Sequence, residues 1–167
     1  MQKESRRRGK WRNVVFGCVA LIILVADQLS KTWIRANLAP GESLLDTGLF
    51  RIIHIQNSGA AFGILKDYTQ VLIVVAFIGI AVILLYVFYL QRRWHILDNM
   101  FVMGALGLVL GGAIGNQVDR LFRGQVTDFV DFRVWPAFNV ADASETVGII
   151  IIVIYILLQV KTTGQSE

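Results

Sequence analysis

Long apolar runs separated by short polar segments dominate the chain. A helix needs about 20 mostly apolar residues to cross a hydrocarbon core of roughly 30 Å, and four windows reach that length, 14–34, 68–90, 96–115 and 140–160. Backbone polar groups in lipid must be satisfied within the segment, and the period-2 alternation typical of a barrel is absent. The pattern therefore predicts an all-α membrane protein, a bundle of four transmembrane helices.

The stretch between the first two windows, residues 36–67, is too polar to cross a membrane. Within it, Leu49 to Gln56 is rich in β-branched and aromatic residues and is bounded by Gly48 and Gly59. Such a run is typical of a strand, and Pro40-Gly41 indicates a turn before it. We expect a small extracytoplasmic β segment, a short strand or hairpin on the outer membrane surface.

The third window carries glycines at every fourth position, Gly107, Gly111 and Gly115. This spacing lets another backbone approach closely, so the third helix is expected at the centre of the bundle. Repeats and low-complexity segments are absent, and residues 1–167 are expected to form a single integral membrane domain.

The distribution of charged residues predicts how the chain is oriented in the membrane. The net charge is +4, with the basic excess concentrated in the first twelve residues, directly before a span. Anionic lipid and topology explain this placement better than nucleic acid does. The positive-inside rule places the N-terminus in the cytoplasm, and four crossings return the C-terminus there.

The first window also has an alternative interpretation as a cleaved secretory signal, because a basic region precedes it. Its apolar part is longer than usual and continues into Asp27-Gln28-Leu29-Ser30-Lys31 without a small-residue cleavage pattern. A retained anchor is therefore expected.

Acidic residues gather at the outer ends of the predicted spans, although an acid at membrane depth costs about 2.5–3.5 kcal/mol on insertion scales. Asp27 and Lys31 are four apart, and Asn116, Asp119 and Arg120 occupy positions i, i+3 and i+4. Each group shares one helical face. Each can be explained, taken alone, as an internally paired helix end.

Asp128 and Asp142 differ because neither has a basic residue at helical spacing. If Asn139 caps the fourth helix, Asp142 falls in its first turn, where a carboxylate complements the helix dipole. Asp128 has no such local explanation, and a solvated loop is the alternative. The two acids lie on different elements, so the sequence leaves open whether they meet.

Two carboxyl groups within hydrogen-bonding reach share a proton at neutral pH. The ionised group can then take a proton from water while the protonated group binds a scissile carbonyl, which hydrolyses a peptide without metal or cofactor. Other hydrolytic schemes fit less well. His54 and His95 fall on opposite predicted sides of the membrane, and no Gly-x-Ser-x-Gly or Cys/His pattern is present.

Five segments, in order along the chain, resemble the lipoprotein signal peptidases (signal peptidase II) of bacteria. They are Asp27-Gln28-Leu29-Ser30-Lys31, Asn57-Ser58-Gly59-Ala60-Ala61-Phe62, the stretch from Gly111 to Arg120, Gly124-Gln125-Val126-Thr127-Asp128-Phe129, and Phe138-Asn139-Val140-Ala141-Asp142-Ala143-Ser144. One such motif is a weak signal, whereas five in order over nearly the whole chain are specific.

The resemblance implies that Asp128 and Asp142 are the catalytic dyad of an aspartyl endopeptidase without a metal. Other residues would bind substrate or support the site: Asp27, Lys31, Asn57, Gly59, Asn116, Asp119, Arg120, Asn139 and Ala141. The implied substrate is a prolipoprotein with a diacylglyceryl group on its lipobox cysteine, cut just before that cysteine. The implied setting is the bacterial inner membrane, with a monomer in contact with lipid and the site near the outer face.

Asp142 in the first turn of a helix is expected to be the ionised member of the dyad, which leaves the shared proton on Asp128. A rival hypothesis is a proton-coupled transporter or channel with a relay of acids, and a third is a non-enzymatic assembly factor that packs through the glycine-rich helix. A relay predicts acids throughout the membrane depth. Here the acids collect at one end.

Overall fold

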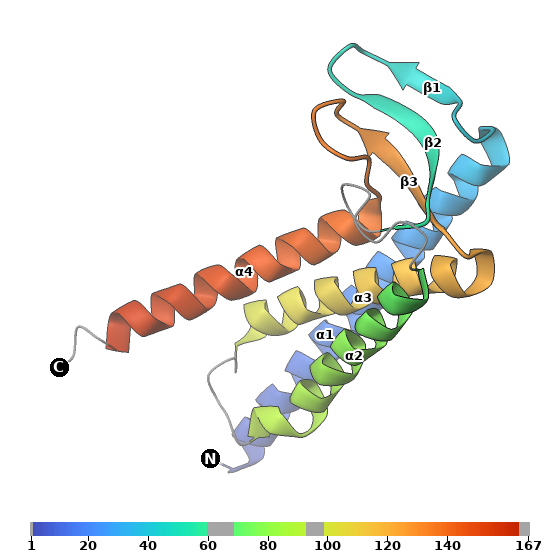
Figure 1. The fold of residues 1–167 in the computed structure, drawn as a ribbon. Coiled ribbons are helices and arrows are strands. Elements are labelled where there is room, and N and C mark those ends of the chain that lie inside the picture. The colour runs from blue at the N-terminus through green and yellow to red at the C-terminus, as the bar shows by residue number, and fades with distance from the viewer. Residues whose placement is uncertain (1, 60–68, 93–98, 164–167) are drawn as a thin grey trace.

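The computed structural model describes residues 2–59, 69–92 and 99–163, a bundle of long helices with a small sheet at one end (Figure 1). The elements are α1 (Gln2–Asn37), β1 (Ser43–Asp46), β2 (Arg51–Asn57), α2 (Thr69–Phe88), a 3-10 turn η2 (Leu90–Arg92), α3 (Met100–Arg123), β3 (Val126–Asp131) and α4 (Val140–Thr163). Four of the described helices are long and apolar enough to cross a membrane. The predicted class, a four-helix membrane bundle, is confirmed.

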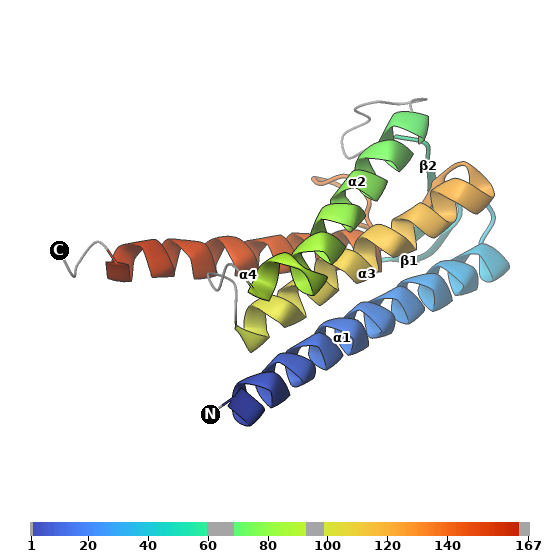
Figure 2. The ribbon, with the colours of Figure 1, turned by 90° about the horizontal axis from the view of Figure 1, so that it is seen from below.

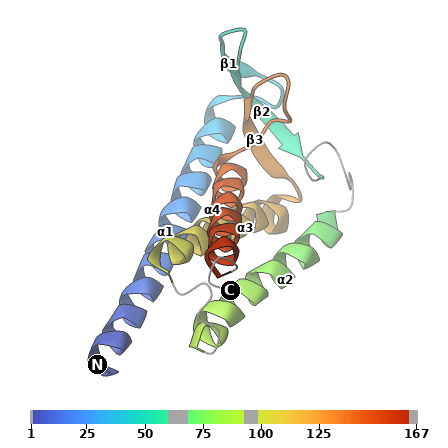
Figure 3. The ribbon, with the colours of Figure 1, turned by 90° about the vertical axis from the view of Figure 1, so that its left-hand side faces the viewer.

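The third helix, α3, lies at the centre of the bundle, with α1 and α4 against it (Figure 2, Figure 3). In its most apolar stretch 61% of the residues are buried, against 17% or fewer in the other three helices. Glycines permit this packing: a Cβ on Gly107 would lie 2.7 Å from the Phe16 carbonyl oxygen, and one on Gly111 would lie 2.6 Å from that of Ala20. The prediction from the glycine spacing is confirmed.

The helix ends differ from the apolar windows, at the start of α1, which begins at Gln2, and at the end of α3. Helix α3 runs from Met100 to Arg123, where the window ended at Gly115. The side chains of Asn116 and Asp119 contact Lys31 of α1. The polar residues after Gly115 therefore remain helical, because their side chains have partners within the protein. Tyr68 and Ile96, the expected starts of the second and third spans, lie outside the described residues, as do His95 and residues 60–62 of the Asn57 motif.

The strands form one antiparallel sheet in the order β1-β2-β3. The β1–β2 hairpin confirms the β segment expected between the first two spans. The third strand comes from the connection between α3 and α4 and was not predicted. In its register Ile55 pairs with Asp128 and Asn57 with Val126. All but one of its residues are buried, so β3 lacks the alternation that identifies a half-buried strand.

Candidate active site

Asp128 is held in the middle of β3 and is buried, with a relative exposure of 2%. The alternative of a solvated loop residue is therefore wrong. Its Oδ2 accepts a hydrogen bond from Asn57 Nδ2 at 2.9 Å, and its Oδ1 accepts one from Asn139 Nδ2 at 2.7 Å. Pairing of β2 with β3 brings Asn57 to this place, while Asn139 comes from the start of α4.

Asn139 and Asp142 bond each other reciprocally at the N-terminus of α4. The backbone N–H of Asp142 donates to Asn139 Oδ1 at 3.0 Å, and the backbone N–H of Asn139 donates to Asp142 Oδ2 at 3.1 Å. This arrangement is a capping box, with the acid at the third helical position. The predicted cap and first-turn placement are confirmed. Asn139 therefore contacts the carboxyl group of Asp128 through its side-chain amide and that of Asp142 through its backbone N–H.

Lys31 supplies a buried positive charge behind these acids. Its ammonium group, with no exposed surface, lies 2.8 Å from Asp27 Oδ2 and 3.5 Å from Asp119 Oδ2. It also donates to Asn116 Oδ1 at 2.8 Å, and Asn116 Nδ2 donates to Asp142 Oδ1 at 2.8 Å. The pair of Asp27 and Lys31 forms as its spacing predicted, but it belongs to a network that spans α1, α3 and α4.

Asp119 has a partner within α3, Arg123, but its shorter contacts reach α1 and β3, so a pairing internal to the helix end explains it only in part. Its Oδ1 lies 3.2 Å from Arg35 of α1 and 3.8 Å from Arg123, while its Oδ2 accepts the backbone N–H of Thr127 at 3.1 Å. The N–H of Thr127 directly precedes Asp128 along β3. Asp119 thus fixes the strand that holds Asp128.

Asp27 joins the first helix to the last. Its Oδ1 accepts the backbone N–H of Ala141 at 3.0 Å, one of the N–H groups at the start of α4 that lack a partner in the helix. Close packing allows this contact, since a Cβ on Gly115 would lie 2.5 Å from Asp27 Oδ2. Gly59 has a comparable part in the connection after β2, because its N–H donates to Asn57 Oδ1 at 2.9 Å and fixes that amide.

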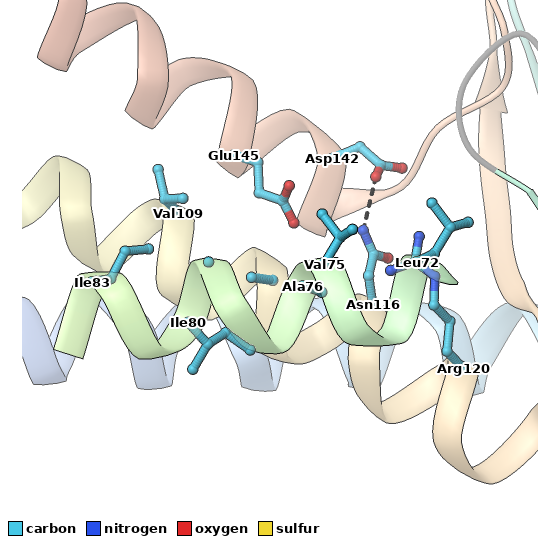
Figure 4. A pocket seen from close by; sticks show the side chains of 12 residues that line it. Leu72, Val75, Ala76, Ile80, Ile83, Val109, Asn116, Arg120, Asp142 and Glu145 are labelled. Carbon is cyan, nitrogen blue, oxygen red and sulfur yellow. Dashed lines mark hydrogen bonds between the residues drawn. The ribbon is translucent and has the colours of Figure 1, made fainter. Parts of the chain in front are cut away.

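A pocket of about 350 Å³ reaches the site from the side, between α2 and α4 (Figure 4). Its walls are mostly apolar, formed by Leu72, Val75, Ala76, Gly79, Ile80, Ile83, Val109 and Ala113. The polar lining residues are Asn116, Arg120, Asp142 and Glu145. Figure 4 shows Asp142 bonded to Asn116 at one end of the pocket. The volume suits a ligand site, and the apolar walls suit a lipid-soluble ligand.

The electrostatic environment of Asp128 differs from that of an ordinary carboxyl group. Burial raises its pKa to about 7, and the negative charge of Asp142 adds to the rise. Hydrogen bonds from Asn57 and Asn139 lower that pKa and offset part of the effect. Asp128 is therefore able to exchange a proton near neutral pH.

Three residues of this site were not singled out from the sequence. Arg35 follows Lys31 by four positions on the same face of α1, a signal that was available. Thr127 receives a hydrogen bond from Arg35 at 3.1 Å, which depends on β3 and had no local signal. Glu145 lies three residues after Asp142 and shares its face of α4.

Fold and site together define the class: a multi-pass integral membrane protein with buried carboxyl groups near one end of the bundle and further acids in an apolar pocket. The chain belongs to the signal peptidase (SPase) II family, whose model matches residues 19–158. It is a multi-pass bacterial membrane peptidase, and the resemblance found from the five motifs is confirmed. Nothing in these comparisons supports a transporter or channel.

Relatives from several bacteria are similar over nearly the whole chain. The lipoprotein signal peptidase of Dehalococcoides mccartyi is 40% identical over 156 residues, which cover 93% of this chain and 97% of that protein. That of Moorella thermoacetica is 41% identical over 152 residues, covering 90% and 98%. A solved bacterial membrane enzyme, determined by the in meso method at 2.3 Å resolution, superposes with a TM-score of 0.78 at 29% identity, covering 87% of this chain and 88% of that one.

Proposed function

We propose that this protein is an aspartyl endopeptidase whose catalytic dyad is Asp128 and Asp142. The observation that carries the proposal is the double contact of Asn139, which bonds Asp128 through its side chain and Asp142 through its backbone and side chain. One fully buried residue thereby contacts both carboxyl groups, and Asp142 also lines the apolar pocket.

Asp142 is the ionised member of the proposed pair, and Asp128 holds the proton. Asp142 lies in the first turn of α4, where the helix dipole favours negative charge, and it accepts hydrogen bonds from Asn116 and Asn139. Asp128 is buried in the sheet, and its pKa of about 7 keeps a proton available.

The reaction follows from these two states. Asp142 takes a proton from water, and the water oxygen attacks the scissile carbonyl carbon while Asp128 transfers its proton to the carbonyl oxygen. When the tetrahedral intermediate collapses, Asp128 recovers that proton, the C–N bond breaks, and the proton on Asp142 passes to the leaving nitrogen. The products are a carboxylic acid and an amine, and the dyad returns to its starting state.

Further polar residues support the dyad in this proposal. Asn57, fixed by Gly59, and Asn139 orient Asp128, whereas Asn116 orients Asp142. Lys31 holds Asn116 and balances the charge of Asp27 and Asp119, and Asp27 fixes Ala141. Arg120 lines the pocket and in this proposal contacts the substrate. All these groups come from one chain, in agreement with an active monomer.

The proposed substrate is a prolipoprotein whose lipobox cysteine carries a diacylglyceryl group, cut just before that cysteine to release the signal peptide. The relatives named lipoprotein signal peptidase support this substrate. The apolar pocket between α2 and α4 suits a substrate that stays in the bilayer and enters sideways. The basic N-terminal tail supports cytoplasmic termini, which puts the sheet and the dyad near the outer face.

The test compares the wild-type protein with Asp128→Asn and Asp142→Asn, each reconstituted in lipid with a diacylglyceryl-modified prolipoprotein. Both variants should lose activity by about a thousandfold, because each removes one role in proton transfer. Asp131→Asn is the matched control: it makes the same change on the same strand, at an acid paired with Arg51. Full cleavage by either dyad variant would overturn the proposal. Loss of wild-type activity to a metal chelator would overturn the metal-free mechanism.

A further inference from the structure

Glu145 brings a carboxyl group into the apolar pocket one helical turn from Asp142. Its side chain points from α4 toward the space between α4 and α2 (Figure 4). The position is fixed by close packing, since a Cβ on Gly112 of α3 would lie 2.7 Å from Glu145 Cγ. The absence of a side chain at Gly112 therefore makes room for the stem of Glu145 against α3.

Within the part of the chain that the structure describes, the Glu145 carboxyl group forms no hydrogen bond and no ion pair. Asp142, on the same face, accepts two hydrogen bonds. A polar group placed among apolar side chains without a partner costs free energy. This cost is recovered if a ligand in the pocket supplies a hydrogen-bond donor.

A peptide substrate has suitable donors. The scissile segment must be extended to expose its carbonyl group to attack, and an extended backbone in lipid leaves N–H groups without partners. The pocket walls beside this segment are mostly apolar and offer few acceptors. A carboxyl group keeps an acceptor oxygen in either protonation state.

The position of Glu145 along α4 selects which part of the substrate it meets. Glu145 follows Asp142 by three positions, a rise of about 4.5 Å, in the direction that leads away from the sheet (Figure 1). With cytoplasmic termini, the signal peptide runs from the scissile bond in the same direction. One or two residues of extended peptide span about 3.3–6.6 Å, which matches the rise.

We propose that Glu145 is a substrate-positioning residue that accepts a hydrogen bond from a backbone N–H of the substrate, one or two residues before the scissile bond. This inference rests on the proposed function, because it takes Asp142 as the point of cleavage. In this inference the apolar pocket binds the backbone of the signal peptide close to the scissile bond. That contact does not depend on which side chains the signal peptide carries.

The experiment combines enzyme variants with substrates in which an ester replaces a single backbone amide and so removes one N–H. Glu145→Met, which removes the acceptor at similar size, should lower kcat/KM on the all-amide substrate about ten- to one-hundred-fold, mainly through KM. Glu145→Gln keeps an acceptor oxygen and should stay within about threefold of the wild type. If Glu145→Met does not fold, Glu145→Ala replaces it in the same series.

An ester at one of the two positions before the scissile bond should reduce wild-type kcat/KM about tenfold and should cause little further loss in Glu145→Met. This coupling is the readout that a purely structural role would not produce. Equal losses in the two enzymes at every position would overturn the inference, as would unchanged kcat/KM in Glu145→Met. Failure of the proposed function is seen separately, as cleavage by Asp128→Asn or Asp142→Asn.

Discussion

Asn139 donates a hydrogen bond through Nδ2 to Oδ1 of Asp128, with the two atoms 2.7 Å apart and the two residues on different elements. The same residue caps α4 and accepts the backbone N–H of Asp142 through its Oδ1. The helix start and the strand centre are therefore fixed relative to each other by one amide side chain. Substitutions of Asn139 should therefore affect catalytic activity and folding stability to different extents.

Asn139→Ser and Asn139→Ala test this difference. Serine is a good cap but lacks the amide donor, whereas alanine lacks both. Both variants should lose about a hundredfold in kcat, because Asp128 keeps its hydrogen bond from Asn57 but loses the one from Asn139. Only Asn139→Ala should also lose about 1 kcal/mol of unfolding free energy, measured by denaturant unfolding in detergent. Wild-type activity in Asn139→Ser would show that the Asp128 contact is dispensable.

Lys31→Met tests the charge balance of the network. Removing the ammonium group leaves Asp27 and Asp119 buried beside each other without their shared cation. Loss of one partner of a buried ion pair costs about 3–5 kcal/mol, so the thermal midpoint should fall sharply. Adding Asp27→Asn to Lys31→Met should recover part of the loss. Lys161→Met, at the exposed end of α4, is the control and should be neutral.

Gly115→Ala tests the packing of α1 against α3. The added Cβ would lie 2.5 Å from Asp27 Oδ2 and 3.1 Å from its Cγ, so Asp27 must move away from Lys31 and Ala141. Overpacking of this kind costs about 1–3 kcal/mol. Gly17→Ala, where nothing lies within 4 Å of the new Cβ, should leave unfolding unchanged. Equal thermal midpoints for the two variants would contradict the prediction.

The pKa of Asp128 predicts how activity depends on pH. The carboxyl group must be protonated to bind the scissile carbonyl in the proposed mechanism, and its pKa is raised to about 7. We therefore expect kcat/KM to fall as pH rises through about 7, measured with a substrate that does not titrate in this range. A kcat/KM that is constant or increases between pH 6 and pH 9 would place the proton elsewhere.

Stability should follow the same titration. The folded protein binds a proton at Asp128 more tightly than the unfolded chain, whose carboxyl groups titrate near 3.9. Folding stability from this group is fully present below about pH 4 and is lost as pH rises through about 7. Asp128→Asn should remove this part of the pH dependence of unfolding, and an unchanged dependence in the variant would contradict it.

The helices could be predicted from the sequence because lipid imposes a simple requirement of length and apolarity. The centre of the bundle could be predicted because Gly107, Gly111 and Gly115 recur at helical spacing. The end of α3 was placed too early, since hydropathy treats Asn116 and Asp119 as polar and takes no account of partners on α1. The capped start of α4 followed from Asn139 and Asp142 alone, because a cap is a local interaction.

The strand that holds Asp128 could not be predicted in this way. It is short and mostly buried, and its partner β2 lies far away in the sequence. For the same reason Thr127 had no signal. The pocket beside Glu145 depends on how α2 and α4 rest on α3, which no spacing within one helix specifies. Arg35 was missed although its spacing from Lys31 was visible, because a cation near a helix end is common.

The hydrogen bond between Asp27 and the backbone of Ala141 joins residues that are 114 positions apart. The first helix is synthesised long before the last, so Asp27 and Lys31, which pair four positions apart, are made well before Ala141. The strand with Asp128 follows later, and the cap with Asp142 comes last. If these two acids are the proposed dyad, the site is complete only after the final helix has been synthesised.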